Sequence, residues 1–173
     1  MNRLCVFAAQ GFGAGKIRFA PGTFGSIVGI AWFFLLILSQ SLSFFIVGTV
    51  AGLMVSIWCC GVAERELGQR DPGSVVLDEI TAMPVCFTGW LMWYWSVYQT
   101  LPDPGYFTRP ASLPMHLITF GAFRLFDIWK PWPIRQSQNL SGGLGITLDD
   151  VLAGTYAALV AGATACVMGP RPM

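Results

Sequence analysis

Residues 19–63 read FAPGTFGSIVGIAWFFLLILSQSLSFFIVGTVAGLMVSIWCCGVA, a run of 45 residues without a charged side chain. One helix needs about 20 apolar residues to cross a bilayer, so the run is long enough for two helices. The polar stretch Ser39–Ser43 divides it. We therefore expect one membrane helix near Phe24–Leu38 and a second near Phe44–Ala63.

The composition of the whole chain favours a membrane protein. Of its 173 residues, 54% are hydrophobic and 11% are charged, whereas soluble domains carry about 25% charged residues. The mean hydropathy is +0.61. Ten basic and nine acidic side chains give a net charge of +1, which excludes a nucleic-acid-binding protein that depends on a large basic surface. The five cysteines form no C-x-x-C pair, so neither a disulfide scaffold nor a zinc ribbon is expected. The first 23 residues lack a discrete apolar core, so we expect no cleavable signal peptide.

Three further helices are expected in the second half of the chain. The 23 uncharged residues between Glu79 and Asp103 predict a third helix near Val75–Tyr98. A fourth is expected near Leu113–Trp129 and a fifth near Asp149–Met168. The predicted fold is an all-α, polytopic membrane bundle of about five hydrophobic helices, formed by a single domain over residues 1–173.

The distribution of basic residues predicts the orientation in the membrane. With the N-terminus inside, seven Lys and Arg residues fall on the inner segments: Arg3, Lys16, Arg18, Arg65, Arg70, Lys130 and Arg135. Arg109, Arg171 and the single histidine, His116, fall on the outer side. Because basic residues are enriched on cytoplasmic loops, this is the expected orientation. The aromatic residues that end the third helix are expected to form a belt at the outer interface; they are Trp90, Trp93, Tyr94, Trp95 and Tyr98.

Acidic side chains collect at the cytoplasmic face in this arrangement. The pairs Asp78–Glu79 and Asp149–Asp150 would each begin a helix, and Asp127 lies in the fourth. Acids at a helix start also interact favourably with the helix dipole, which is the alternative explanation for each pair. The four acids of these pairs would repel one another unless a cation lay between them, and oxygen ligands favour Mg²⁺. We therefore expect the two pairs, together with Asp127, to be metal ligands.

The fourth helix supplies basic side chains beside this cluster. Arg124, Asp127 and Lys130 are spaced i, i+3, i+6 and share one helical face, and Arg135 follows in the next loop. Ion pairing within the helix is one explanation. The functional explanation is a clamp for phosphate oxygens, which Arg and Lys bind well.

Two glycine-rich segments lie on the same predicted side. Gly22 and Thr23 precede the first helix, and Gly142 and Gly143 precede the fifth. Each segment can bring backbone N–H groups close to an anion. The segment Gly11–Lys16 is not a P-loop, because Gln10 and Ile17 occupy positions that need Gly and Ser or Thr.

Other phosphatase chemistries lack their residues. A cysteine phosphatase needs Arg six residues after its cysteine, but Met92 stands six residues after Cys86. His116 falls on the outer side of the membrane, away from the acidic residues, so it does not suit a histidine nucleophile. Metal-assisted chemistry on a phosphate remains. A transporter is an alternative, although it would need polar groups through the bilayer, and the second predicted helix has no charge. A non-catalytic membrane assembly factor is another.

Four segments together resemble one known family. They are APGTFGS (20–26), DPGSVVLDEI (71–80), FRLFDIWKPWPIR (123–135) and SGGLGITLDDVLAG (141–154). They resemble the phosphatidylglycerophosphatase A family of bacterial Mg²⁺-dependent enzymes. The chain departs from the family pattern at Ala82, Ser141 and Thr147, and none of these departures removes a charge.

The resemblance implies removal of the terminal phosphate from phosphatidylglycerophosphate, in the bacterial inner membrane and at its cytoplasmic face. Carried over, the catalytic residues are Asp78, Glu79, Asp127, Lys130 and Arg124. Substrate binding is expected from Thr23, Gly22, Arg135, Gly142 and Gly143, and Mg²⁺ binding from Asp78, Glu79, Asp149, Asp150 and Asp127. The general base is expected in the Asp78–Glu79 pair, and attack by a carboxylate through a phospho-enzyme stays open. Another lipid phosphate is the alternative substrate, the lipid bilayer is the expected partner, and the oligomeric state stays open.

Overall fold

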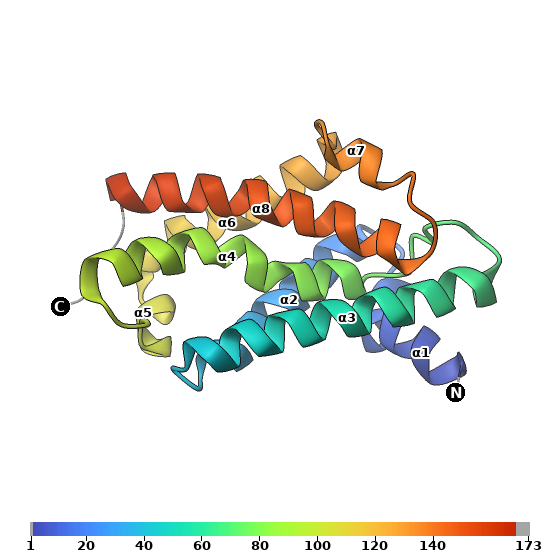
Figure 1. The fold of residues 1–173 in the computed structure, drawn as a ribbon, viewed down its shortest axis with the longest axis horizontal. Coiled ribbons are helices and arrows are strands. Elements are labelled where there is room, and N and C mark those ends of the chain that lie inside the picture. Colours follow the sequence, from blue (N-terminus) through green and yellow to red (C-terminus); the bar gives the residue numbers. More distant parts are fainter. Residues whose placement is uncertain (1, 169–173) are drawn as a thin grey trace.

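A computed structural model describes residues 2–168, and this part of the chain is helical with no strand. The elements are α1 (Asn2–Ala9), the 3₁₀ helix η1 (Gly11–Lys16), α2 (Pro21–Ile37), α3 (Leu42–Leu67), α4 (Leu77–Tyr98), α5 (Pro104–Thr108), the 3₁₀ helix η2 (Pro110–Ser112), α6 (Leu113–Trp129), α7 (Ile134–Ser137) and α8 (Gly143–Met168). The five predicted helices are therefore present as α2, α3, α4, α6 and α8. Figure 1 shows them as an elongated bundle in which α4 and α8 lie side by side.

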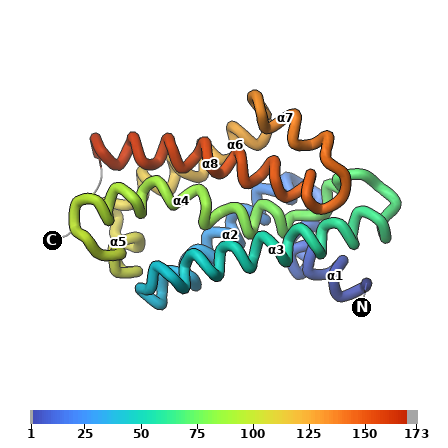
Figure 2. The backbone as a smooth tube through the Cα atoms, in the orientation of Figure 1, coloured from blue at the N-terminus to red at the C-terminus, as the bar shows by residue number. Residues whose placement is uncertain are grey.

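The chain reverses direction between consecutive long helices, so its connections gather at two ends. The α3–α4 loop, α7 and the start of α8 lie at one end, together with α1 (Figure 2). The α2–α3 loop and α5 lie at the other end. Both α4 and α8 begin at the first end, so the two helices run parallel.

Small residues let α4 and α8 approach closely. A Cβ atom added to Gly154 would lie 3.3 Å from the Cys86 sulfur, and one added to Gly162 would lie 3.3 Å from the Gly89 carbonyl oxygen. Small residues at helix contacts allow backbones to come close together. Residues near 82–86 thus face 154, and residue 89 faces 158–162. One turn earlier, the same register places Asp78 opposite Asp150.

Local sequence signals set both ends of α3. The Ser41 side chain accepts a hydrogen bond from the Phe44 backbone N–H at 3.3 Å and caps α3. Gly68, with φ of +63°, ends the same helix. The break predicted at Ser39–Ser43 lies between α2 and α3.

The expected start of the last helix is wrong. The sequence predicted that Asp149 and Asp150 begin it, but α8 begins at Gly143 and places both acids well inside the helix. The reason is packing. A Cβ atom at Gly143 would overlap the Ile57 carbonyl of α3, so the glycine lets the first turn of α8 lie directly on α3.

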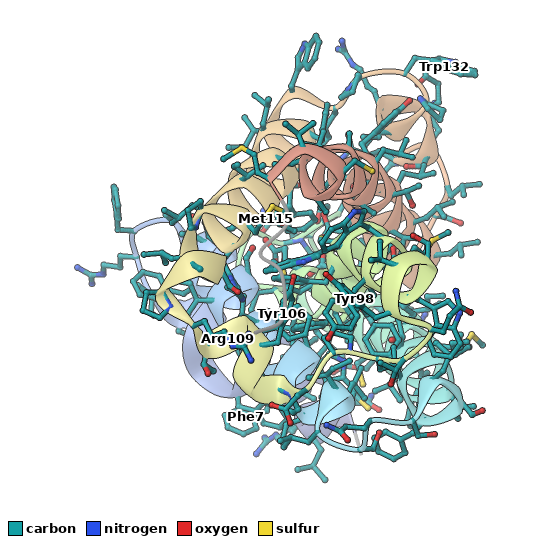
Figure 3. All side chains as sticks on the ribbon, turned by 90° about the vertical axis from the view of Figure 1, so that its left-hand side faces the viewer. Phe7, Tyr98, Tyr106, Arg109, Met115 and Trp132 are labelled. Carbon is teal, nitrogen blue, oxygen red and sulfur yellow. The ribbon has the colours of Figure 1, made fainter. Side chains whose placement is uncertain are left out.

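The expected aromatic belt at the end of α4 needs correction. Trp90 is fully buried, and its indole N–H donates to the Tyr106 hydroxyl at 3.2 Å. Tyr94 is also buried. Both side chains are covered because α5 folds back against this end of the bundle. In Figure 3, viewed from that end, Tyr106 lies towards the middle of the molecule, whereas Trp132 projects from the edge.

Two helices in residues 2–168 are long and apolar enough to cross a membrane, α3 and α8. Helix α2 is apolar but has only 17 residues. Large apolar side chains are exposed along the flank of α3, among them Val47, Val50 and Met54. Extended exposed apolar surface is typical of a membrane or protein contact. The expectation of five spanning helices is not confirmed, and Arg171, counted above on the outer side, lies outside the described residues.

The N-terminal helix α1 was not expected from the sequence. It packs against α3 through Cys5 and Ala9, which are buried. The Ala9 carbonyl accepts a hydrogen bond of 2.9 Å from the Val76 N–H. Helix α1 therefore fixes the residues that immediately precede the first turn of α4.

Candidate active site

Three carboxylates from α4 and α8 meet at the end of the bundle where both helices begin. The ligand oxygens of Asp78, Glu79 and Asp150 all lie within 4.8 Å of one another. Asp78 and Asp150 are 7% and 3% exposed, and the Glu79 side chain is 12% exposed. Such a group of buried acids is costly unless positive charge or protons compensate it.

Each of the three acids has an oxygen without a hydrogen-bond partner. These atoms are Asp78 Oδ1, Glu79 Oε2 and Asp150 Oδ2. Buried polar atoms are nearly always hydrogen-bonded, so three unpaired carboxylate oxygens in one place call for an explanation. An all-oxygen donor set fits a hard divalent cation such as Mg²⁺. The residues present therefore fit the predicted ion.

Arg124 joins two acids of the predicted site. Its Nη1 atom lies 2.9 Å from Asp127 Oδ2 and 3.7 Å from Glu79 Oε1. The same nitrogen lies 3.5 Å from the hydroxyl of Ser26 on α2. The arginine thus orients the Glu79 and Asp127 side chains from the α6 side. Arg124 therefore makes both the ion pair within α6, with Asp127, and the contact with Glu79 of α4.

Lys130 ends α6 and reaches across to α8. Its ammonium donates to Asp149 Oδ2 at 2.5 Å and lies 4.0 Å from Asp127 Oδ1. Burial alone would lower the pKa of Lys130, but the hydrogen bond and charge of Asp149 outweigh burial and raise that pKa above its ordinary value. The lysine therefore stays positively charged. Its left-handed backbone, with φ of +48°, ends the helix just before Pro131.

A cavity of about 160 Å³ lies among these groups, and we call it the acidic cavity. The ionisable residues that line it are Asp71, Asp78, Glu79, Asp127, Lys130, Asp149 and Asp150. The five predicted metal ligands and Lys130 are therefore brought together. Asp71 was not among the predicted site residues. It lies in the loop before α4, and its place in the DPGSVVLDE segment was the available signal.

The N-terminal turn of α2 lies against the acidic group. A Cβ atom at Gly22 would overlap Glu79 Oε1, and one at Gly25 would lie 3.2 Å from Glu79 Oε2. These glycines provide the space that Glu79 occupies. Thr23 lies on the same turn, and its backbone N–H donates to the Ala20 carbonyl at 3.0 Å. This donor is already engaged within the turn.

A second and larger cavity adjoins the first, and we call it the outer cavity. It has a volume of about 550 Å³ and shares Asp71 and Asp149 with the acidic cavity. Gly142 and the exposed Arg135 line it. Gly143 is buried against α3 instead. Arg135 thus lines a different cavity from Lys130, with which the sequence had grouped it.

Comparison with known proteins decides the family. The model of the phosphatidylglycerophosphatase A family matches residues 7–165, nearly the whole chain. The chain belongs to the phosphatidylglycerophosphatase A family. The residues that form the acidic cavity all lie inside the matched region.

Individual relatives agree with this membership. The phosphatidylglycerophosphatase A of Escherichia coli (strain K12) is 33% identical over 152 residues, covering 87% of this chain and 77% of the relative. The enzyme of the same name from Haemophilus influenzae is 33% identical over 155 residues, covering 88% and 83%. A putative phosphatidylinositol-3-phosphatase of Bacteroides thetaiotaomicron is also 33% identical, over 183 residues and 96% of each chain. No solved structure matches the chain significantly.

Proposed function

We propose that this protein removes the terminal phosphate of phosphatidylglycerophosphate in the acidic cavity, giving phosphatidylglycerol and inorganic phosphate. Membership of the phosphatidylglycerophosphatase A family supports the reaction and the lipid substrate. The observation that carries the proposed chemistry is the group of three unpaired, buried oxygens on Asp78, Glu79 and Asp150. A phosphatase that uses a divalent cation needs such a group.

The proposed cation is Mg²⁺, held by Asp78, Glu79 and Asp150 with help from Asp127 and Asp149. When bound, the ion supplies positive charge for the phosphate oxygens and makes water a better nucleophile. The protein would contribute the fixed geometry of the carboxylates, which α4 and α8 hold at close range. Asp71 lines the same cavity and is a further candidate for holding the ion or its water.

The remaining groups would orient the reactants. One carboxylate of the Asp78–Glu79 pair would accept a proton from the attacking water. Arg124 would hold Glu79 and Asp127 in place and offer its other N–H groups to the phosphate. Lys130 would hold Asp149 and bring a second positive charge to the phosphoryl group as it passes from the lipid alcohol to water. Charges fixed before the reaction stabilise a transition state without reorganisation at the moment of reaction.

The membrane arrangement belongs to the same proposal. All five long helices would cross the bacterial inner membrane, with the acidic cavity at the cytoplasmic face. The acyl chains would then remain in the inner leaflet while the headgroup enters the cavity. Trp129 and Trp132 are exposed near this end of α6, and tryptophan is typical of a membrane interface. They would sit beside the lipid that enters.

Phosphate release from phosphatidylglycerophosphate tests the proposal. We expect purified protein in detergent to release phosphate with Mg²⁺ and to lose this activity with EDTA. Asp78→Asn should lower turnover at least as much as losing a general base, on the order of a hundredfold to ten-thousandfold. Glu66→Gln, at an exposed acid of α3, is the control and should keep full activity. Full activity of Asp78→Asn would refute the assignment of the site.

A second substrate is favoured by the Bacteroides relative, whose name specifies phosphatidylinositol-3-phosphatase. That lipid also carries a phosphate monoester on a polyol, which a phosphodiester joins to diacylglycerol. Assays of both lipids side by side at equal surface concentration would identify the preferred one. If kcat/KM is higher for the inositol lipid, that lipid replaces phosphatidylglycerophosphate as the proposed substrate.

A further inference from the structure

The outer cavity contains two arginines that come from separate segments. Arg70 lies in the α3–α4 loop and Arg135 in α7, and both line the cavity of about 550 Å³. Arg70 donates to the backbone carbonyl of Gln138 at 2.5 Å. This bond ties the α3–α4 loop to the segment that follows α7. The wall of the outer cavity is therefore held together by one of its own arginines.

These arginines differ from the two cations that pair with carboxylates of the acidic cavity. Arg124 and Lys130 each lie within 4.0 Å of two carboxylates. Within residues 2–168, neither Arg70 nor Arg135 has a carboxylate that close. Their guanidinium groups are thus not neutralised by an ion pair. Arginines without an ion pair in a concave surface are well suited to bind an anion through two parallel N–H bonds.

A hydrogen-bond chain connects the two cavities. The Gln138 side-chain amide donates to Asp149 Oδ2 at 3.1 Å, and Lys130 donates to the same oxygen. Arg70 holds the backbone of that same glutamine. An anion bound at Arg70 and Arg135 would therefore lie at a defined position relative to Asp149. A ligand long enough to enter both cavities would have its two ends fixed separately.

We infer that the outer cavity binds the phosphodiester of the lipid headgroup, while the acidic cavity takes the terminal phosphate monoester. This inference rests on the proposed function, because that substrate carries two phosphates separated by a glycerol. Only the monoester is hydrolysed, so the protein must tell the two groups apart. A singly charged diester suits two arginines and needs no metal. The doubly charged monoester suits the cavity whose carboxylates fit a divalent cation.

The remaining side chains of the outer cavity suit a polyol. Gln136, Asn139 and Glu64 line it, and their amide and carboxylate groups can bond hydroxyls. The glycerol between the two phosphates carries such a hydroxyl. Binding the diester would then determine which lipids are good substrates. Phosphatidic acid has a terminal monoester but no diester, so it would gain nothing from the outer cavity.

Substrate preference and product binding test the inference. We would measure kcat/KM for phosphatidylglycerophosphate and for phosphatidic acid in mixed micelles, using Arg70→Gln, Arg135→Gln and the double variant. A hydrogen bond to a charged group contributes enough that losing it lowers affinity on the order of tenfold or more. We expect the preference for phosphatidylglycerophosphate to fall by about this factor in each single variant, mainly through KM. Arg18→Gln, at an exposed arginine before α2, is the matched control and should leave the preference unchanged.

Binding of the product separates this inference from the proposed function. Short-chain phosphatidylglycerol carries the diester but no monoester, and its affinity can be measured in EDTA without turnover. We expect binding to wild type and Arg18→Gln and weaker binding to the double variant. Arg70→Lys keeps the charge without the planar fork and should fall between them. Equal binding to wild type and the double variant, or an unchanged preference between the two substrates, would overturn the inference. Arginine-dependent binding without phosphate release would instead support it and refute the proposed reaction.

Discussion

The ammonium of Lys130 lies 2.5 Å from the carboxylate of Asp149 and joins the end of α6 to α8. Asp149 is 4% exposed, so its charge is removed from water and depends on this partner. Gln138 adds one hydrogen bond to the same oxygen. The contact is therefore a structural link between two helices as well as part of the acidic cavity.

Replacing Lys130 by Met should destabilise the fold and stop turnover. The change leaves the buried carboxylate of Asp149 without its cation, which should lower the free energy of unfolding by about 2 kcal/mol. The double variant Lys130→Met with Asp149→Asn should recover this stability, because no uncompensated charge remains, but should not recover activity. Thermal unfolding in detergent and phosphate release measure the two effects. If the double variant unfolds as easily as the single one, the ion pair is not the cause of the loss.

Mg²⁺ should stabilise the wild-type protein by binding the folded state. At a concentration one hundred times Kd, a ligand of this kind adds about 2.7 kcal/mol. Asp150→Asn should lack this gain. In EDTA the same variant should be at least as stable as wild type, since one of the mutually repelling carboxylates is gone. Unfolding curves with and without Mg²⁺ test both statements, and Glu66→Gln should respond to Mg²⁺ like wild type. A full Mg²⁺ response in Asp150→Asn would remove that residue from the metal site.

Gly89→Ala should separate α4 from α8 and misplace their carboxylates. A Cβ atom at Gly89 would overlap the Ala158 carbonyl, and forcing extra volume into a packed contact costs about 1–3 kcal/mol. Gly121→Ala on α6 is the matched control, because nothing lies within 4 Å of its added Cβ. It should be neutral or stabilise by roughly 0.5–1 kcal/mol. Melting temperature and phosphate release should both fall for Gly89→Ala only. Equal behaviour of the two variants would contradict the close packing of α4 and α8.

Helices with strong local end signals could be predicted from the sequence. Helix α6 has the predicted bounds, Leu113–Trp129, because prolines stand at its start and just after Lys130. The starts of α1 and α8 could not be predicted, because they depend on tertiary packing. Gly143 begins α8 only because α3 offers a surface on which a residue without a side chain can lie. Helix α1, with eight residues, is too short to be stable alone.

Much of the candidate site could be predicted from charge alone. Ionisable residues are rare in this chain, so each one near a predicted helix start stood out. Asp71 did not stand out because it lies in a polar loop, where an acid is ordinary. The separation of Arg135 from Lys130 depends on α7, a short helix that contains Arg135 and that periodicity does not predict. Proximity in sequence was misleading for that pair.

Cysteine labelling can test the proposed orientation in the membrane. Cys166 is exposed and the other four cysteines are buried, so Cys166→Ser gives a background of low reactivity. Thr100→Cys and Gln69→Cys then place single exposed thiols in the α4–α5 loop and the α3–α4 loop, which lie at opposite ends of the bundle (Figure 1). If the acidic cavity faces the cytoplasm, a membrane-impermeant maleimide should label the first variant in spheroplasts. The second should react only after detergent is added, because its loop lies at the end with the acidic cavity. Labelling in the reverse order would put that cavity on the outer face, where it could not meet a lipid phosphate in the inner leaflet.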